Sequence, residues 1–262
     1  MKSSRLKAIL FIASLLFASS VKLHSAGGEA DPIKVDWSFK GITGKFDRAS
    51  LQRGFQVYKE VCSSCHSMQY LSYRNLGEPG GPEFSEQEVK AIAASIEITD
   101  GPNDQGEMFT RPGRPADKFK NPYPNVKASI AANGGAYPPD MSVLVKARPG
   151  GSNYIYSVLV GYEDPPEGVT LDDGVYYNKY MIGNKIKMSS PLSDDIVEYS
   201  DGKQATVDQM AKDVTTFLTW AAEPELEERH RTGVKVIIYL VLLTTLVYLS
   251  MKKIWSRVDT EV

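Results

Sequence analysis

The sequence predicts a mainly α-helical domain with long loops, followed by one transmembrane helix near the C-terminus. Three observations predict it: apolar residues recur at helical spacing behind capping signals, Gly- and Pro-rich stretches separate these segments, and residues 234–251 form an 18-residue apolar run. With 262 residues, 42% of them hydrophobic, and a formal net charge of −2, the chain can bury one sizeable core beside accessory segments.

The N-terminus has the features of a secretory signal. Lys2, Arg5 and Lys7 precede a short apolar run over residues 8–18. An amphipathic transit peptide fits less well, because this run is apolar on all sides. Cleavage is expected after Ser20, Ser25 or Ala26, and we take residues 1–26 as the signal peptide. The signal predicts export of the domain behind it into the periplasm.

The run at residues 234–251 predicts a membrane anchor. At 1.5 Å per residue it covers about 27 Å, close to the hydrocarbon thickness of a bilayer. Only Lys235 interrupts it, and this side chain can snorkel to the head groups. A buried soluble helix is the alternative, which the length of the run disfavours. Because everything before the anchor is exported, residues 252–262 are expected to form a short cytoplasmic tail.

The exported part is expected to be one folded domain over residues 27–224, joined to the anchor by a juxtamembrane linker at 225–233. Residues 27–45 show little periodicity and predict an extended strap. Asp47 then predicts the N-cap of a helix whose apolar face carries Leu51, Phe55, Tyr58 and Cys62. A glycine inside this helix, Gly54, indicates close approach by another backbone.

Two further helices begin at predicted capping boxes. Ser85 with Glu88 precedes Val89, Ile92 and Ile96, and Thr206 with Gln209 precedes Met210, Val214, Phe217 and Leu218. The second of these helices ends before Pro224. A shorter helix is expected after Gly150-Gly151, through Tyr154 to Val160. Residues 100–124, rich in Gly and Pro, predict an ordered loop without regular structure.

The motif Cys62-Ser63-Ser64-Cys65-His66 is typical of covalent haem attachment. Two thiols at this spacing can add to the two vinyl groups of one haem, and the next residue brings an imidazole to the iron. A redox-active dithiol is the alternative, but its usual βαβ setting is missing from the pattern. The sequence therefore predicts one haem c and an electron carrier. The stiff segment 121–124, with Pro122 and Tyr123, can form a wall for a flat ligand.

The motif does not identify the residue that provides the sixth ligand of the iron. His24 lies at the signal boundary and His230 at the membrane edge, so a second histidine is not well placed to close the pocket. A methionine sulfur is the natural alternative and raises the reduction potential. The candidates are Met108, Met141, Met181, Met188 and Met210. Of these, Met210 lies on an apolar helix face and is expected in the core.

The chain resembles the cytochrome c1 family, the haem-bearing subunit of the cytochrome bc1 complex. The segments that carry the resemblance are Cys62–His66, Gly101–Asn103 with Gly106–Met108, Arg111–Gly113, Asn121–Asn125, Ala132–Ala136 with Pro138–Asp140, Ala147–Arg148, Gly161–Tyr162 with Pro165–Pro166, and Trp220–Glu225. They cover nearly the whole mature chain. The resemblance implies a cytochrome c-like haem domain with long loop insertions.

The same resemblance implies further site residues. The family's axial methionine lies in a segment similar to residues 183–192, which selects Met188. The resemblance also implies that Arg148 lies near the haem propionates with Tyr154 close by, and that Pro122 and Tyr123 line the haem. A guanidinium can form charge-assisted pairs with a propionate.

The resemblance implies a redox subunit rather than an enzyme on its own. Electrons would come from a Rieske iron–sulfur protein and go to a soluble or tethered cytochrome c. Cytochrome b would be a further neighbour. The whole assembly would be a dimeric, proton-translocating quinol–cytochrome c oxidoreductase of the bacterial inner membrane. A free-standing, membrane-tethered cytochrome serving an oxidase or reductase is the alternative. A haem enzyme with an open axial position is a third hypothesis. Nothing in the sequence indicates nucleic-acid binding.

Acidic residues are unevenly distributed. Between Glu83 and Glu107 there are seven against Lys90 alone, and a second group has no base within it: Glu163, Asp164, Glu167, Asp172 and Asp173. Any one of these carboxylates is best explained as part of a solvated face. Together, the groups predict steering of a basic redox partner, with more effect on its association rate than on its affinity.

Overall fold

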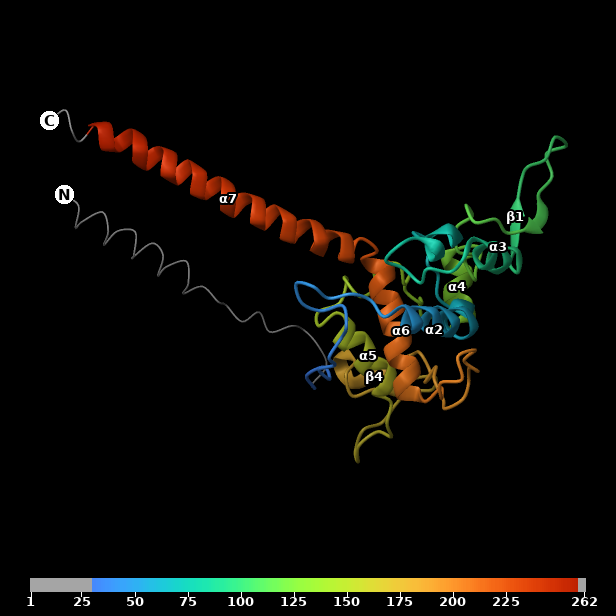
Figure 1. The fold of residues 1–262 in the computed structure, drawn as a ribbon. Helices are drawn as coiled ribbons and strands as arrows, with labels where there is room; N and C mark the ends of the chain where they lie inside the picture. The colour runs from blue at the N-terminus through green and yellow to red at the C-terminus, as the bar shows by residue number, and fades with distance from the viewer. Residues whose placement is uncertain (1–29, 259–262) are drawn as a thin grey trace.

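The structure is a computed structural model that describes residues 30–258. This part is mainly α-helical, as the sequence predicts, with a helical body from which α7 extends in one direction and the β1–β2 hairpin in another (Figure 1). The α-helices are α2 (Arg48–Glu60), α3 (Glu86–Ala94), α4 (Val126–Ala132), α5 (Ser152–Val160), α6 (Val207–Ala222) and α7 (Leu226–Val258); the strands are β1 (Glu97–Asp100), β2 (Phe109–Pro112), β3 (Tyr176–Tyr177) and β4 (Lys185–Ile186); and three 3₁₀ turns are η1 (Cys62–Ser64), η2 (Tyr73–Gly77) and η3 (Ile182–Asn184). The predicted signal peptide, residues 1–26, lies outside the described residues.

The body is organised around the crossing of α2 and α6. Gly54 lies at the point of closest approach, where a Cβ atom would be 2.1 Å from the carbonyl oxygen of Asp213 and 2.7 Å from Cβ of Phe217. The predicted backbone approach is therefore confirmed. Around it, the rings of Phe55 and Tyr58 from α2 lie 5.7 and 5.8 Å from the ring of Phe217, centroid to centroid. This aromatic contact buries the inner faces of both helices.

An ion pair also joins the two helices inside the core. The guanidinium of Arg53 donates from Nε to Asp213 at 2.8 Å and from a terminal nitrogen to Asp201 at 2.7 Å. Asp213 is fully buried, and its other oxygen accepts from the hydroxyl of Ser50 at 2.6 Å. Because a buried charge without its partner is strongly unfavourable, this network restricts the register in which α2 and α6 can pack.

Most of the predicted caps are present. Asp47 accepts from the backbone of Ser50, and Ser85 and Glu88 make both bonds of a capping box. At α6 the prediction is half wrong: Thr206 accepts from the backbone of Gln209, but the Gln209 side chain donates to Asp213 at 2.9 Å instead of reaching back. The reason is local, since the buried carboxylate of Asp213 one turn further on is a charged and stronger acceptor.

The sequence predicts a loop without regular structure over residues 100–124. This prediction is wrong for the first part of that range. Strands β1 and β2 pair antiparallel, from Glu97 opposite Pro112 to Asp100 opposite Phe109. Helix α4, which the sequence did not predict, comes after this region, and its N-cap Asn125 accepts from the backbone of Ala128 at 2.9 Å.

The predicted strap is confirmed over its described part. Residues 30–45 form no helix or strand and run along α5, where the backbone of Ile33 donates to the hydroxyl of Ser157 at 2.8 Å. The indole nitrogen of Trp37 donates to the side chain of Asn153 at 2.7 Å. Trp37 is itself buried, so the strap is part of the core and not only a cover over it.

Helix α7 includes both the predicted linker and the predicted anchor. It runs without interruption from Leu226 to Val258, and its apolar part has a mean hydropathy of 2.1 with no residue of that window buried. Its first turn is tied to the body, because both carboxylate oxygens of Glu227 accept from Arg48, at 2.7 and 2.9 Å. One turn later, Nδ1 of His230 lies 3.1 Å from the carbonyl oxygen of Gly44. The stretch expected to be a linker is therefore helical and fixed to the domain.

Candidate functional site

The two thiols lie on a tight turn at the end of α2. The α-helix ends at Glu60, and Cys62–Ser64 form a 3₁₀ turn, so the expectation that the α-helix carries Cys62 is wrong. Hydroxyls of the intervening serines explain the change, since Ser63 donates to the carbonyl of Lys59 at 2.7 Å and Ser64 to that of Val61 at 2.9 Å. These bonds satisfy carbonyls that a continuing helix would use. Cys62 and Cys65 are both half-buried free thiols, and burial, with the nearby Cys65, raises the pKa of Cys62 to about 12.

The turn leads the chain directly to His66. Its backbone nitrogen donates to the carbonyl of Cys62 at 2.9 Å, and its ring is buried. Nδ1 lies 2.9 Å from the carbonyl oxygen of Pro139, so this nitrogen carries the proton. Burial lowers the pKa of His66, although the Pro139 carbonyl and the Asp140 charge oppose the shift. The lowered pKa favours the neutral ring, in which Nε2 carries the lone pair that can bind a metal.

Asp140 holds the Pro139 carbonyl in place. One carboxylate oxygen accepts from the hydroxyl of Ser67 at 2.7 Å and from the backbone of Gln69 at 2.9 Å, and the other accepts from the backbone of Ser142 at 2.9 Å. The backbone of Met141 donates in turn to the carbonyl of Ser67 at 2.8 Å. Residues 66–70 and 139–142 are thus held together by a network around one carboxylate, which fixes the orientation of the imidazole.

Replacement of Asp140 by asparagine is expected to weaken this junction. The change removes the charge from three hydrogen bonds, and we expect the free energy of unfolding to fall by about 1–3 kcal/mol. Burial alone would raise the pKa of Asp140, but the bonds from Ser142, Gln69 and Ser67 outweigh it and lower the pKa. The stabilisation is therefore present at neutral pH and is lost as the pH falls through this lowered pKa, so the difference between wild type and variant should shrink in acid.

Denaturant titrations of both proteins at several pH values measure this difference. Asp173→Asn, on an exposed loop, is the matched control and should leave stability unchanged. Equal stability of Asp140→Asn and wild type at pH 7 would contradict the role given to Asp140.

Met188 lies in a loop just after β4 and is half-buried. The hydroxyl of Tyr162 donates to its backbone carbonyl at 3.1 Å, and the ammonium of the adjacent Lys187 donates to the carbonyl of Gly134 at 3.3 Å. Gly134 and Pro139 belong to one segment, residues 133–140. This segment therefore contacts the His66 region at one end and the Met188 loop at the other.

The other candidate methionines have different surroundings. Met210 is fully buried in α6 and packs in the core, and Met108 is exposed on the loop between β1 and β2. The sulfur of Met181 accepts from the hydroxyl of Tyr154 at 3.3 Å. Met141 follows Asp140 directly and is buried on the same stretch of chain that meets His66. The assignment of Met188 as the iron ligand stays a prediction.

Arg148 and Tyr154 lie near one another. Arg148 is exposed and donates to the carbonyl of Ala147 at 3.2 Å. Tyr154, on α5, is buried, and its burial raises the pKa of its hydroxyl while the positive charge of Arg148 works against that rise. The pair offers a cation and a hydroxyl on the α5 side of the site.

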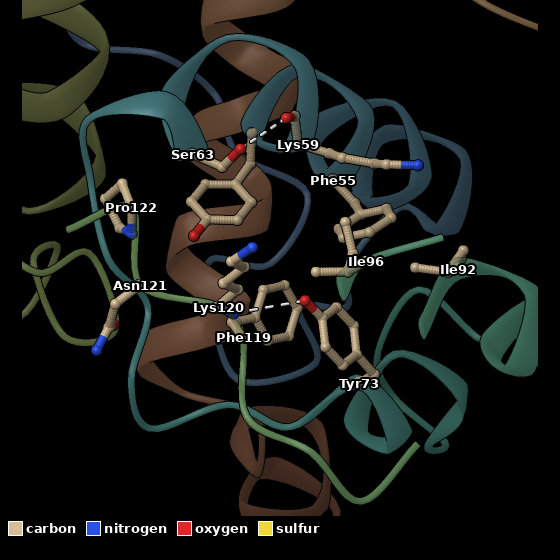
Figure 2. A pocket seen from close by; sticks show the side chains of 11 residues that line it. Phe55, Lys59, Ser63, Tyr73, Ile92, Ile96, Phe119, Lys120, Asn121 and Pro122 are labelled. Atoms are coloured by element: carbon tan, nitrogen blue, oxygen red, sulfur yellow. Dashed lines mark hydrogen bonds between the residues drawn. The ribbon is translucent and has the colours of Figure 1, made fainter. Parts of the chain in front are cut away.

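A cavity of about 160 Å³ lies beside the turn that follows α2. Pro122 and Ser63 line it, together with aromatic side chains that include Phe119 (Figure 2). Cys62, Cys65, His66 and Met188 do not line it. Tyr58 also lines the cavity, and its hydroxyl donates to the carbonyl of His66 at 3.4 Å. Tyr123 follows Pro122 and is half-buried.

The donor chemistry fits a haem. Two thiols separated by two residues, an imidazole held through Nδ1, and a thioether sulfur are the groups that haem c uses. Among residues 30–258, no group of three or more His, Cys, Asp or Glu side chains is arranged to hold a bare metal ion.

Comparison with known proteins adds an independent observation. A family model described as "Cytochrome C1 family" matches residues 37–258. The protein "Cytochrome c1" of Rhodospirillum rubrum is 46% identical over 96% of this chain and 97% of its own length. "Cytochrome c1-2, heme protein, mitochondrial" of Solanum tuberosum is 55% identical over 79% of this chain and 78% of its own length. "Cytochrome b/c1" of Bradyrhizobium diazoefficiens is 49% identical over 94% of this chain, which spans 39% of that protein.

Proposed function

The chain belongs to the cytochrome C1 family, and on that premise we propose that it acts as the membrane-anchored, haem-bearing electron-transfer subunit of a cytochrome bc1 complex. The observation that carries the proposal is the turn at Cys62–His66, which presents two thiols and an imidazole whose Nδ1 is held by the Pro139 carbonyl. When bound, the haem supplies an iron that accepts and donates one electron at a time.

Each predicted residue has a role in this proposal. Cys62 and Cys65 would hold one haem c covalently, and Nε2 of His66 with the sulfur of Met188 would bind its iron. An iron held by two protein ligands would leave no place for substrate, which suits an electron carrier and not an enzyme. The lining residues proposed around the haem are Arg148 and Tyr154, toward the propionates, and Pro122 and Tyr123.

The proposed setting is a bacterial inner membrane. Residues 234–251 of α7 cross the bilayer, the haem domain faces the periplasm, and the tail after residue 251 is cytoplasmic. Cytochrome b and a Rieske iron–sulfur protein are the resident neighbours, within a dimeric complex. Electrons reach this subunit from the Rieske protein and leave to a soluble or tethered cytochrome c, so that the subunit is one redox step of quinol–cytochrome c oxidoreductase.

Purification through a tag on this chain tests the proposal. Membranes solubilised in mild detergent should give cytochrome b and a Rieske protein in equal amounts with this chain, one haem that survives acid–acetone extraction, and oxidation of quinol by the assembly. The double variant Cys62→Ser/Cys65→Ser should lose the extraction-resistant haem. A chain that retains its haem but purifies alone would instead support a free-standing tethered cytochrome.

The acidic group at Glu163, Asp164 and Glu167 is proposed to guide the accepting cytochrome. The three carboxylates are exposed, and they begin one residue after Tyr162, whose hydroxyl contacts Met188. Changing all three to lysine is expected to slow electron delivery to a basic cytochrome c about tenfold at low ionic strength, because steering acts mainly on the association rate. Stopped-flow reduction at about 10 and about 500 mM salt, where screening is weak and strong respectively, measures it. The two proteins should converge at high salt, and equal rates at low salt would exclude this surface.

A further inference from the structure

The β1–β2 hairpin, residues 97–112 with the intervening loop, projects from the helical body (Figure 1). Near its outer end it carries two large apolar side chains in the open, since Met108 is 60% exposed and Phe109 is 42% exposed. Neither residue serves the haem site proposed above. Adjacent apolar side chains on a projecting element are a typical feature of a surface that is covered in an assembly.

The hairpin is braced so that it keeps its shape. At its base, Arg111 donates to Asp100 at 2.5 Å and makes two bonds to Asp117, at 2.7 and 2.9 Å. In the loop, the side chain of Asn103 accepts from the backbones of Gln105 and Glu107, at 3.0 and 2.9 Å. A segment held in this way is ordered before it meets a partner, so binding requires little further loss of conformational entropy.

The outer loop of the hairpin carries negative charge. No lysine or arginine occurs between residues 91 and 110, while Asp104 and Glu107 are exposed on the loop. Asp100, in contrast, is paired with Arg111. The end of the hairpin therefore presents an apolar pair, Met108 and Phe109, bordered by two carboxylates that have no cation beside them in sequence.

We propose that the β1–β2 hairpin docks onto a resident protein subunit of the same membrane complex, at an apolar recess bordered by lysine or arginine side chains. The inference rests on the proposed function, which supplies a permanent assembly. Large exposed apolar side chains fit a lasting contact, since permanent interfaces are more apolar than the small, wet contacts of soluble redox partners. The flexible thioether of Met108 can adapt to an irregular recess.

Site-specific photo-crosslinking in the assembled complex tests the proposal. p-Benzoyl-phenylalanine is placed at position 109 and, as a control, at position 176, because Tyr176 on β3 is also 42% exposed. After purification at high salt and irradiation, position 109 should cross-link to one other subunit of the complex and position 176 should not. Equal yields at both positions, or a product only with a second copy of this chain or with cytochrome c, would overturn the proposal.

A substitution provides the second measurement. Phe109→Lys places a cation in the proposed apolar recess, next to its lysine or arginine border, and is expected to lower recovery of the complex at least tenfold, with haem content and optical spectrum unchanged. Tyr176→Lys should assemble normally. Normal assembly of Phe109→Lys would refute the docking role alone, whereas a wild-type chain that purifies without partners would refute the proposed function.

Discussion

The haem-loaded Met188→Ala variant is expected to bind carbon monoxide in its reduced state, which the wild-type chain should exclude. Alanine removes the only group proposed for the sixth position, so the optical band that depends on the sulfur–iron bond should disappear. Loss of a thioether ligand also removes a stabiliser of the reduced iron, and the reduction potential should fall. Spectra with and without carbon monoxide, together with a redox titration, measure all three effects.

Met181→Ala and Met141→Ala are the matched controls. The sulfur of Met181 accepts from the hydroxyl of Tyr154, and Met141 directly follows segment 133–140 and donates from its backbone to the carbonyl of Ser67. Both controls should keep the sulfur-dependent band and exclude carbon monoxide. An unchanged spectrum in Met188→Ala would move the ligand to one of these residues and remove Met188 from the site.

Gly54→Ala is expected to disrupt the packing of α2 on α6. The new Cβ would lie 2.1 Å from the carbonyl oxygen and 2.6 Å from the carbonyl carbon of Asp213, both backbone atoms that cannot rotate away. The helices must separate, and overpacking of this severity is expected to lower the free energy of unfolding by about 3 kcal/mol or more. The buried pair between Arg53 and Asp213 would be strained by the same displacement.

Thermal and denaturant unfolding of the haem-loaded protein measure this loss. Gly233→Ala is the control, because Gly233 also lies inside a helix, and a Cβ there would have nothing within 4 Å. That change should be neutral or slightly stabilising, as alanine is the better helix former. If both variants were equally stable, the close approach of the two backbones would not be a determinant of the fold.

The helical part of the fold could be predicted because its signals are local. Asp47, Ser85 with Glu88, and Thr206 each lie within three residues of the backbone groups that they cap. The close approach at Gly54 also follows from one residue, since a glycine is otherwise unfavourable inside a helix. The bond from Gln209 to Asp213 competes with the capping box within the same helix, and the pattern of capping residues alone does not reveal this competition.

The sequence pattern does not predict the β1–β2 hairpin, and the reason is physical. Its strands are four residues long, too short for a clear alternation of burial, and the loop contains the turn residues Gly101, Pro102 and Gly106, which dominate the pattern. Helix α4 had a local signal, since Asn125 is a good N-cap residue. At seven residues, however, the helix shows barely two turns of periodicity.

The candidate site also has one part that could be predicted from local sequence and one part that could not. The thiols and His66 are contiguous in sequence, so they could be named from the motif alone. The contact that orients His66 comes from Pro139, 73 residues away, and has no local signal. Met188, the proposed sixth ligand, lies in a loop that is held by contacts of Tyr162 and Lys187 with backbone carbonyls. Spacing could therefore supply several methionines but could not rank them.

The continuous course of α7 has a consequence for how partners meet this protein. No proline occurs in the helix, and the ties from Glu227 to Arg48 and from His230 to Gly44 leave no swivel at its root. With residues 234–251 in the bilayer as proposed, the domain would be carried on one unbroken helix, so its tilt relative to the membrane would be restricted. That restriction would reduce the range of orientations that a neighbour in the same membrane has to sample during docking.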